Sequence, residues 1–284
     1  MPSTYAHFKF GQEIYKRLPE SIKKSVDLSP QLFAAGQHGP DILFYYNVLK
    51  SNPVNRIGYG MHAKPAADFF VSALSVLRDP EDDAAERAYI YGFVCHFMLD
   101  SCVHWYVEDA ISEYGVPHTS IEADFDRMLM EEDGLDPVRH MTASHIIPSQ
   151  ENAAAIAKFF PQLSARHILK SLKDMRFYSN LIVCRSALKR RAMLAALKML
   201  GHYDTIGGMI IRPKADERCR ISTPVLKRLF DTALDEAEKY LKEFENAIET
   251  GKPLSERFYR TFGPDKESRE EYEIYTSGKI MDTL

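Results

Sequence analysis

The chain has 284 residues, of which 45% are hydrophobic and 27% charged, a composition typical of a globular protein with a sizeable core. Its formal net charge of −4, from 36 Lys and Arg against 40 Asp and Glu, excludes a protein built mainly to hold nucleic acid. The four cysteines form no Cys-x-x-Cys pair, and the chain has neither an apolar N-terminal segment nor an apolar run of about 18 residues. We therefore expect a cytoplasmic protein without a signal peptide or a membrane span.

Apolar residues recur at helical spacing along nearly the whole chain, and no run of alternating β-branched residues predicts a strand. The predicted fold class is therefore all-α. Segments 31–40, 51–60 and 133–148 are rich in turn-forming residues and are expected to be loops. In chain order, the pattern predicts helices over residues 4–18, 21–26, 41–46, 61–77, 82–109, 118–131, 149–160, 164–200 with one break, and 222–250.

No linker-like composition divides the chain, which predicts a single helical domain over residues 1–284. Within it, residues 1–131 carry nearly all the metal-type side chains and are expected to form a metal-binding half. Residues 149–250 would cover that half with further helices, and residues 264–284 would form a charged tail.

The predicted helix over residues 82–109 holds the strongest chemical signal. It is apolar nearly all the way round, so we expect it to be buried. His96, Asp100 and His104 nevertheless occupy positions i, i+4 and i+8, which stack on one helix face. Buried imidazoles and carboxylates must be satisfied, either by one another in a hydrogen-bond ladder or by a divalent metal. This helix alone leaves both interpretations open.

Further metal-type residues lie on either side of this helix. His118 and Glu122 repeat its four-residue spacing, with Asp126 one turn further on, whereas His38 and Asp41 flank a Gly-Pro turn. Each of them alone also fits a helix cap or a solvated helix face. In chain order they are His7, His38, Asp41, His62, His118, Glu122 and Asp126.

The N-terminus offers one more ligand. Pro2 is small, so we expect Met1 to be removed, which would leave a free α-amine five residues before His7. The alternative is a mobile terminus without a role. A mixed set of imidazoles and carboxylates favours zinc over manganese or iron.

In this order the residues resemble the zinc-dependent phospholipase C family and, more distantly, the fungal trinuclear-zinc single-strand nucleases. The pattern of these helical enzymes is an N-terminal residue that binds through its own backbone, an early His, a loop Asp, a His, His-x-x-x-Asp, another His, and His-x-x-x-(Glu or Asp). Residues 1–131 match it with His7, Asp41, His62, His96-x-x-x-Asp100, His104 and His118-x-x-x-Glu122.

The resemblance implies two or three zinc ions. One would be held by Asp41, His62, His96 and Asp100, a second by His104, His118 and Glu122, and a third by His7, Asp100 and the N-terminal amine. The chain departs from the family in two places. It has no N-terminal Trp. His104 also follows Asp100 after a single helical turn, which is closer than the spacing expected for the family and could shift the position of the second metal.

The implied activity is that of a zinc-dependent, phospholipase C-like hydrolase of phosphoric ester bonds. A metal-bridged hydroxide would attack a phosphodiester or phosphomonoester, with Asp41 orienting or deprotonating the nucleophile. The expected partner is a small phosphate ester or a phospholipid substrate. His38, Tyr45 and Tyr59 are weaker candidates for substrate binding, because ordinary packing or a surface position explains them equally well.

Two alternatives remain open on the sequence alone. One is a single-strand nuclease or nucleotidase on the same metal site, and the other is a non-catalytic metal-binding protein. A nuclease would need basic surroundings, but the basic stretches at 185–191 and 214–220 also fit solvated helix or loop faces. We therefore expect no stable complex with nucleic acid, and the oligomeric state is left open.

Overall fold

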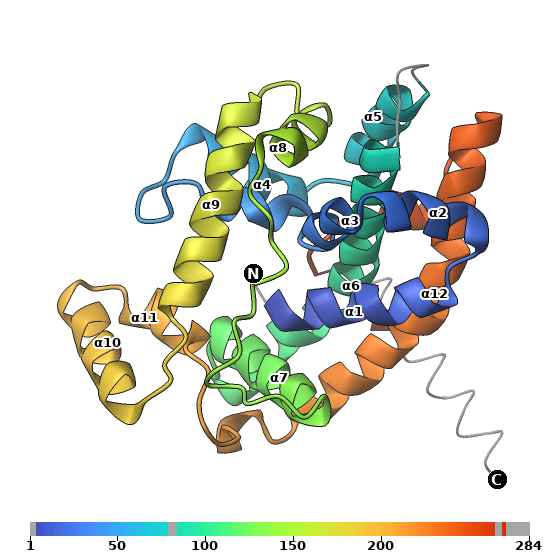
Figure 1. Ribbon diagram of the computed structural model, residues 1–284. Helices are drawn as coiled ribbons and strands as arrows, with labels where there is room; N and C mark the ends of the chain where they lie inside the picture. Colours follow the sequence, from blue (N-terminus) through green and yellow to red (C-terminus); the bar gives the residue numbers. More distant parts are fainter. Residues whose placement is uncertain (1–3, 79–83, 265–268, 271–284) are drawn as a thin grey trace, which may run out of the picture.

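The computed structural model describes residues 4–78, 84–264 and 269–270 and confirms the all-α fold class (Figure 1). Strand-type pairing within these ranges is limited to an isolated bridge between Pro65 and Thr261. The α-helices are α1 Thr4–Arg17, α2 Glu20–Leu28, α3 Pro30–Gly36, α4 Pro53–His62, α5 Ala67–Leu77, α6 Ala84–Tyr114, α7 His118–Glu132, α8 Gln150–Ala157, α9 Ala165–Leu181, α10 Ala187–Met199, α11 Tyr203–Ile206 and α12 Ser222–Thr250. The short 3₁₀ helices are η1 Gly39–Tyr45, η2 Gly207–Met209, η3 Glu217–Cys219 and η4 Glu256–Tyr259.

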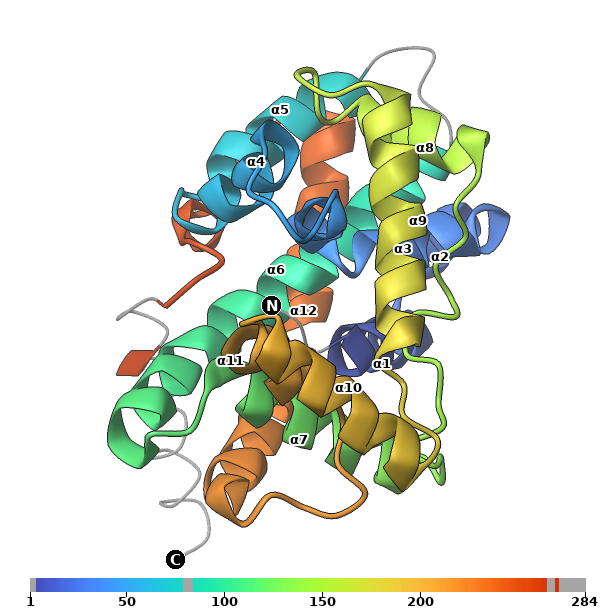
Figure 2. The ribbon, with the colours of Figure 1, turned by 90° about the vertical axis from the view of Figure 1, so that its left-hand side faces the viewer.

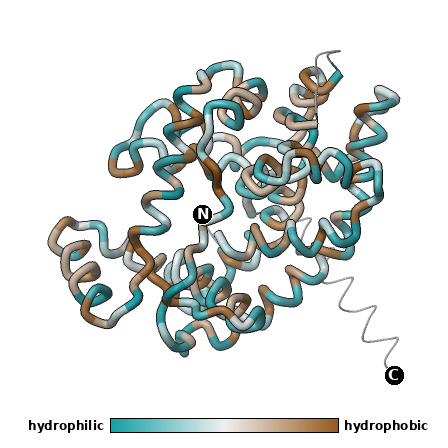
Figure 3. Tube along the Cα trace, viewed as in Figure 1, coloured by the Kyte–Doolittle hydropathy of each residue, from teal (hydrophilic) through white to brown (hydrophobic). Residues whose placement is uncertain are grey.

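Helix α6 runs through the centre of the structure. Its residues from 88 to 101 are all buried, as the apolar sequence predicts. It packs against α3 and α12 and also contacts α1 and α2, and Figure 2 shows α6 and α12 side by side. Helix α12 is amphipathic, and hydrophobic and hydrophilic residues alternate along it in Figure 3. Because this stretch of α6 is buried on all sides, helices pack around it, and it forms the centre of the fold.

One hydrophobic cluster joins these helices and includes residues from Tyr5 near the start of the chain to Phe262 near its end. The division into a metal-binding half and covering helices stays a prediction. Most of the predicted charged tail, residues 265–268 and 271–284, lies outside the described residues. Within the described ranges, no helix combines the length and apolarity needed to cross a membrane.

Segment 31–40, predicted as a loop, instead forms helix α3 and the start of η1. Pro30 occupies the first turn of α3, where its missing N–H is no loss. Gly36 ends α3 directly against α6: a Cβ on Gly36 would lie 2.0 Å from the carbonyl oxygen of Tyr89. Gly92 on α6 is the reciprocal partner, since a Cβ there would lie 2.1 Å from the carbonyl oxygen of Phe33. These two glycines let the helix backbones touch, so Gly36 is a packing residue and not a loop signal.

Segment 51–60, also predicted as a loop, is largely helix α4. Its turn-forming residues are start signals: the side chain of Asn52 accepts hydrogen bonds from the backbone N–H groups of Val54 and Asn55, and Pro53 follows the cap. The helix predicted over 61–77 is accordingly interrupted at 63–66, where the N–H of Ala66 donates to the carbonyl of Arg260 at 2.8 Å. The predicted break within 164–200 is found at residues 182–186.

We expect Gly36→Ala and Gly92→Ala each to lower the free energy of unfolding by about 1–3 kcal/mol, because the added methyl group meets backbone that cannot rotate away. Urea unfolding followed by circular dichroism measures the change. Gly60→Ala in α4 is the matched control: a Cβ there meets nothing within 4 Å, so stability should hold or rise. Equal urea midpoints for all three variants would contradict the close contact between α3 and α6.

Candidate metal centre

The eight predicted ligands come from five helical elements that meet in one region. Helix α6 supplies three of them, and α1, η1, α4 and α7 bring the others to its face. Six of the eight side chains are buried, and His62 and His118 at helix ends are half-buried. The eight are His7 on α1, Asp41 on η1, His62 at the end of α4, His96, Asp100 and His104 on α6, and His118 and Glu122 on α7.

The carboxylate of Asp100 lies at the centre of this group, in contact with four imidazoles. Its Oδ1 lies 3.3 Å from Nε2 of His7 and 3.2 Å from Nδ1 of His104. Its Oδ2 lies 3.5 Å from Nε2 of His62 and 3.6 Å from Nε2 of His96. One buried negative charge therefore draws together side chains from three helices.

Three groups of potential ligands have donor atoms within 4.8 Å of one another. The group on α6 and α7 matches the set that the resemblance implies for the second metal. The other two share His96, whereas the resemblance makes Asp100 the shared residue; Asp100 nevertheless reaches His62 as well. The groups are His7, His96 and Asp100; Asp41, His62 and His96; and His104, His118 and Glu122.

The separations between donor atoms fit zinc. Nε2 of His62 lies 3.1 Å from Oδ1 of Asp41, and Nε2 of His118 lies 3.0 Å from Oε1 of Glu122. Two ligands at about 2.0–2.1 Å from a tetrahedral zinc ion are about 3.3–3.4 Å apart. The donor atoms thus already stand at nearly the spacing that a shared zinc ion requires.

Several of these atoms are buried without a hydrogen-bond partner in the described part of the chain. They include both ring nitrogens of His96, Oδ1 of Asp41 and Oδ2 of Asp100. A buried polar atom that makes no hydrogen bond destabilises a fold by roughly 1–3 kcal/mol. A His–Asp–His hydrogen-bond ladder does not satisfy these atoms, whereas a bound cation would, and this favours the metal interpretation.

Two of the imidazoles are oriented through their second nitrogen. Nδ1 of His62 lies 2.9 Å from the carbonyl oxygen of Gly58, and Nδ1 of His104 lies 3.1 Å from that of Asp100. A carbonyl only accepts hydrogen bonds, so in each ring Nδ1 carries a proton, and the neutral ring would present the lone pair of Nε2. Such outer contacts fix ring orientation in metal sites, and here they direct Nε2 to the cluster.

Ligation needs neutral imidazoles and ionised carboxylates, and the charge states meet this need in part. Burial acts to lower the pKa of His62, but contacts with the carboxylates of Asp100 and Asp41 outweigh it and raise that pKa to about 10. Asp100 likewise raises the pKa of His104 against burial, so a cation that binds these two rings must displace a proton.

Three other groups are already in the required state. Burial lowers the pKa of His96 to about 3. Burial acts to raise the pKa of Asp100, but the imidazoles of His104 and His96 outweigh it and hold that pKa well below its usual range. Burial likewise acts to raise the pKa of Glu122, but that pKa is lowered, and contacts with His118 and His104 contribute to the shift.

Two further residues position the ligands. Asp126, one turn beyond Glu122, accepts hydrogen bonds from the backbone N–H groups of Tyr5 at 3.0 Å and Ala6 at 2.8 Å. It therefore caps α1 from α7 and brings His7 to the cluster. Gly39, with φ of +47°, lies against the ring of His96, where a Cβ would come within 2.2 Å of Cδ2. Sequence reasoning missed both roles, which depend on contacts between distant segments.

The weaker substrate-binding candidates have different surroundings. His38 is buried and faces His145, with the two Nε2 atoms 2.6 Å apart and the rings stacked at 4.9 Å. His145 comes from the predicted loop over 133–148, where no periodic pattern marks it. Tyr59 is 55% exposed and stacks on Phe44 with ring centroids 4.2 Å apart. His38 thus points to a neighbouring histidine, and Tyr59 lies at the surface.

Four candidate ligands, His7, Asp100, His104 and Glu122, line a cavity of about 20 Å³.

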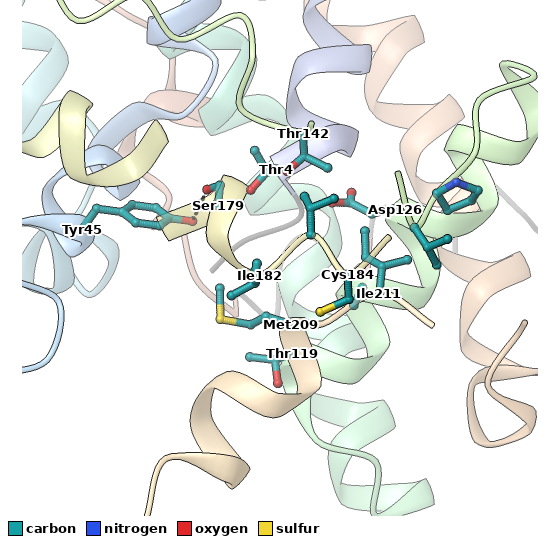
Figure 4. Close-up of a pocket in the computed structure, with 14 residues that line it drawn as sticks. Thr4, Tyr45, Thr119, Asp126, Thr142, Ser179, Ile182, Cys184, Met209 and Ile211 are labelled. Atoms are coloured by element: carbon teal, nitrogen blue, oxygen red, sulfur yellow. Dashed lines mark hydrogen bonds between the residues drawn. The ribbon is translucent and has the colours of Figure 1, made fainter. Parts of the chain in front are cut away.

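Tyr45, the third candidate, lines a different cavity of about 40 Å³, whose wall contains none of the eight candidate ligands (Figure 4). Thr119 and Ala123 on its wall directly follow the ligands His118 and Glu122. Hydroxyl groups and apolar side chains share the lining. The predicted ligand at the chain's N-terminus, which depends on Met1 and Pro2, lies outside the described residues.

We expect Asp100→Asn to weaken zinc binding at least about 100-fold, because the substitution removes the charge that four imidazoles share. Elemental analysis and competition with a chelator measure the loss. Asp109→Asn on the same helix is the matched control, since its carboxylate pairs with Arg269 at 3.2 Å and belongs to none of the three ligand groups. Full zinc content and affinity in Asp100→Asn would show that the cluster is not a metal site.

Comparison with known proteins agrees with this geometry. The family model described as zinc dependent phospholipase C matches residues 6–173, which include all eight candidate ligands. Searches of curated proteins and of solved structures found no match. The matched range is 168 of the 284 residues and so covers more than half of the chain. The chain therefore belongs to the zinc dependent phospholipase C family.

Proposed function

We propose that the protein is a zinc-dependent, phospholipase C-like hydrolase of phosphoric ester bonds, with a small phosphate ester or a phospholipid as substrate. The observation that carries the proposal is the convergence of three His and carboxylate groups around Asp100, where His7, Asp100, His104 and Glu122 line a cavity. Family membership supports the same chemistry. Two or three zinc ions would occupy the groups, and the number stays a prediction.

Zinc bound at such groups would polarise the phosphoryl oxygens and lower the pKa of a water molecule towards about 7. The chain's own residues would do the rest. Asp41 is ionised, because its contacts with His62 and His96 outweigh burial and lower its pKa. Its Oδ1 has no hydrogen-bond partner within the described ranges, and it faces the same space as His62. We assign it the role of orienting the attacking water and accepting its proton.

The cavity that Tyr45 lines is the proposed place for the leaving group, because Thr119 and Ala123 on its wall directly follow His118 and Glu122 in the chain. Figure 4 shows Tyr45 and Ser179 on one side and Asp126 on another. The hydroxyl of Ser179 donates to that of Tyr45 at 3.5 Å, and the carboxylate of Asp126 is already engaged by α1. The hydroxyls can therefore bind polar atoms of a leaving group, while the apolar lining limits water.

A single-strand nuclease on the same site is the second candidate, and the basic stretch over 185–191 is the observation in its favour. The other basic stretch, over 214–220, is partly neutralised: Asp216 pairs with Arg218 at 2.7 Å and with Arg212 at 3.3 Å. Only one of the two basic stretches is therefore left without acidic neighbours in the sequence, and for this reason we rank the nuclease below the small-ester hydrolase. The cytoplasmic location stays a prediction.

The zinc-loaded chain should hydrolyse a phosphocholine diester or a phosphomonoester at least about tenfold faster than single-stranded DNA. A chelator should abolish turnover and added zinc should restore it, because the metal supplies the charge that the phosphoryl group needs. Colorimetric release of the leaving group measures both. Faster cleavage of DNA would favour the nuclease, and full zinc content without turnover of any ester would favour a non-catalytic protein.

Asp41→Asn should lower kcat at least about 100-fold, because an amide cannot accept the proton of the attacking water. Zinc content measured on the same sample separates loss of metal from loss of the base. Asp68→Asn, an exposed carboxylate on α5, is the control and should keep full activity. An unchanged kcat in Asp41→Asn would remove Asp41 from the mechanism.

A further inference from the structure

Helix α10 stands apart from the rest of the fold. It packs chiefly against the short α11 and on a small hydrophobic cluster that is separate from the main core. Figures 1 and 2 place it at the edge of the molecule, and in Figure 2 it faces the viewer. The family match ends at residue 173, so α10 lies outside the region that the family model describes.

The side of α10 that faces the protein packs in a small hydrophobic cluster. Leu197 is buried there with Cys184 and Ile210, and Met193 and Leu194 pack against them. These three residues of α10 fall within one side of the helix at 100° per residue. The helix therefore needs no second apolar face in order to stay folded against the protein.

A second apolar face exists nevertheless, and it is exposed. Leu188, Ala192, Ala195 and Met199 follow the spacing i, i+4, i+7 and i+11, which places them in one row opposite the buried side. The side chain of Leu188 is 79% exposed and that of Met199 is 87% exposed, and Leu200 just beyond is 71% exposed. Large exposed apolar residues in a row mark an interaction surface more often than isolated ones do.

This row lies in the most cationic part of the chain. Residues 175–203 contain six Lys and Arg and no Asp or Glu, although the chain as a whole has a net charge of −4. Arg191 and Lys198 are exposed and lie along one side of the row, and neither forms an ion pair with any residue that the structure describes. Lys189 instead holds the start of α10, donating to the carbonyl oxygens of Leu181 and Val183.

We propose that this face of α10, defined by Leu188, Met199, Leu200, Arg191 and Lys198, docks the protein on an anionic phospholipid surface. An exposed apolar row with cations along one side suits the boundary between lipid headgroups and acyl chains, where the apolar side chains insert and the cations meet phosphate. The proposal concerns docking and does not rest on the hydrolytic activity proposed above.

Other occupants fit the surface less well. Full burial of the three large side chains covers roughly 100 Å² each, well below the roughly 800 Å² per partner of a standard protein interface. A second copy of the helix would also set Arg191 and Lys198 against like charges. Single-stranded nucleic acid is bound by stacking bases on aromatic rings, and the row is aliphatic.

The position of α10 links docking to the cavity. Ile182, Val183 and Cys184, which precede α10, line the cavity, and so do Met209 and Ile211, which follow α11. The residues on both ends of the segment that carries the exposed row therefore line the cavity. A protein docked through α10 would hold this cavity close to the lipid surface.

Flotation of the full chain with vesicles tests the proposal. The chain should float with phosphatidylcholine vesicles that contain about 30% phosphatidylserine, at least about tenfold more than with pure phosphatidylcholine, and binding should weaken in 0.5 M NaCl. The double variant Leu188→Glu and Met199→Glu should lose at least about tenfold of this binding. Thermal unfolding, zinc content and turnover of a soluble ester should not change, because neither residue touches the metal cluster or the cavity.

Val71→Glu on α5 is the matched control, because Val71 is also an exposed aliphatic side chain, at 52%, and it should keep full binding. Absence of vesicle binding by the unmodified chain would overturn the proposal, as would binding that the double variant retains. Dimerisation lost in the double variant would assign the face to a second copy. Single-stranded DNA that competes with the vesicles would assign it to nucleic acid. Vesicle binding without ester turnover would leave docking intact and overturn the proposed hydrolysis alone.

Discussion

The negative charge of Asp100 is the constraint on which the rest of the site depends. It lies on the stretch of α6 between residues 88 and 101, which is buried throughout, so water cannot solvate it. Four imidazoles from α1, α4 and α6 surround it instead. Because no part of α6 between residues 88 and 101 is exposed, this charge cannot move to solvent, and α1 and α4 bring their histidines to it.

Close backbone contacts make that arrangement possible. Gly36 and Gly92 bring α3 against α6, and α3 leads directly into η1, which carries Asp41. Gly39 then lets η1 pass against the ring of His96. The position of Asp41 thus depends on three glycines that bind nothing themselves. A small displacement of η1 would carry Asp41 away from His62, since their contact spans 3.1 Å.

The sequence predicts the parts of the protein that rest on regular spacing. The helical period gives α6, α7 and α12 to within a few residues, and the spacing of His96, Asp100 and His104 places them on one face. Helices α3 and α4 were wrongly predicted as loops, because Pro, Gly and Asn mark helix starts and close contacts as well as turns. The capping role of Asp126 and the pairing of His38 with His145 join segments more than 100 residues apart, so no local pattern reveals them.

Two sets of elements form the wall of the cavity that Tyr45 lines. One set comprises α1, η1 and α7, the elements that carry candidate ligands, and the other comprises residues 137–142, 182–184 and 209–211, which carry none. Substitutions in the second set can change the shape of the cavity while the ligands stay in place. Under the proposed function, substitutions in this part of the wall would change which leaving group fits while the candidate metal centre stays unchanged.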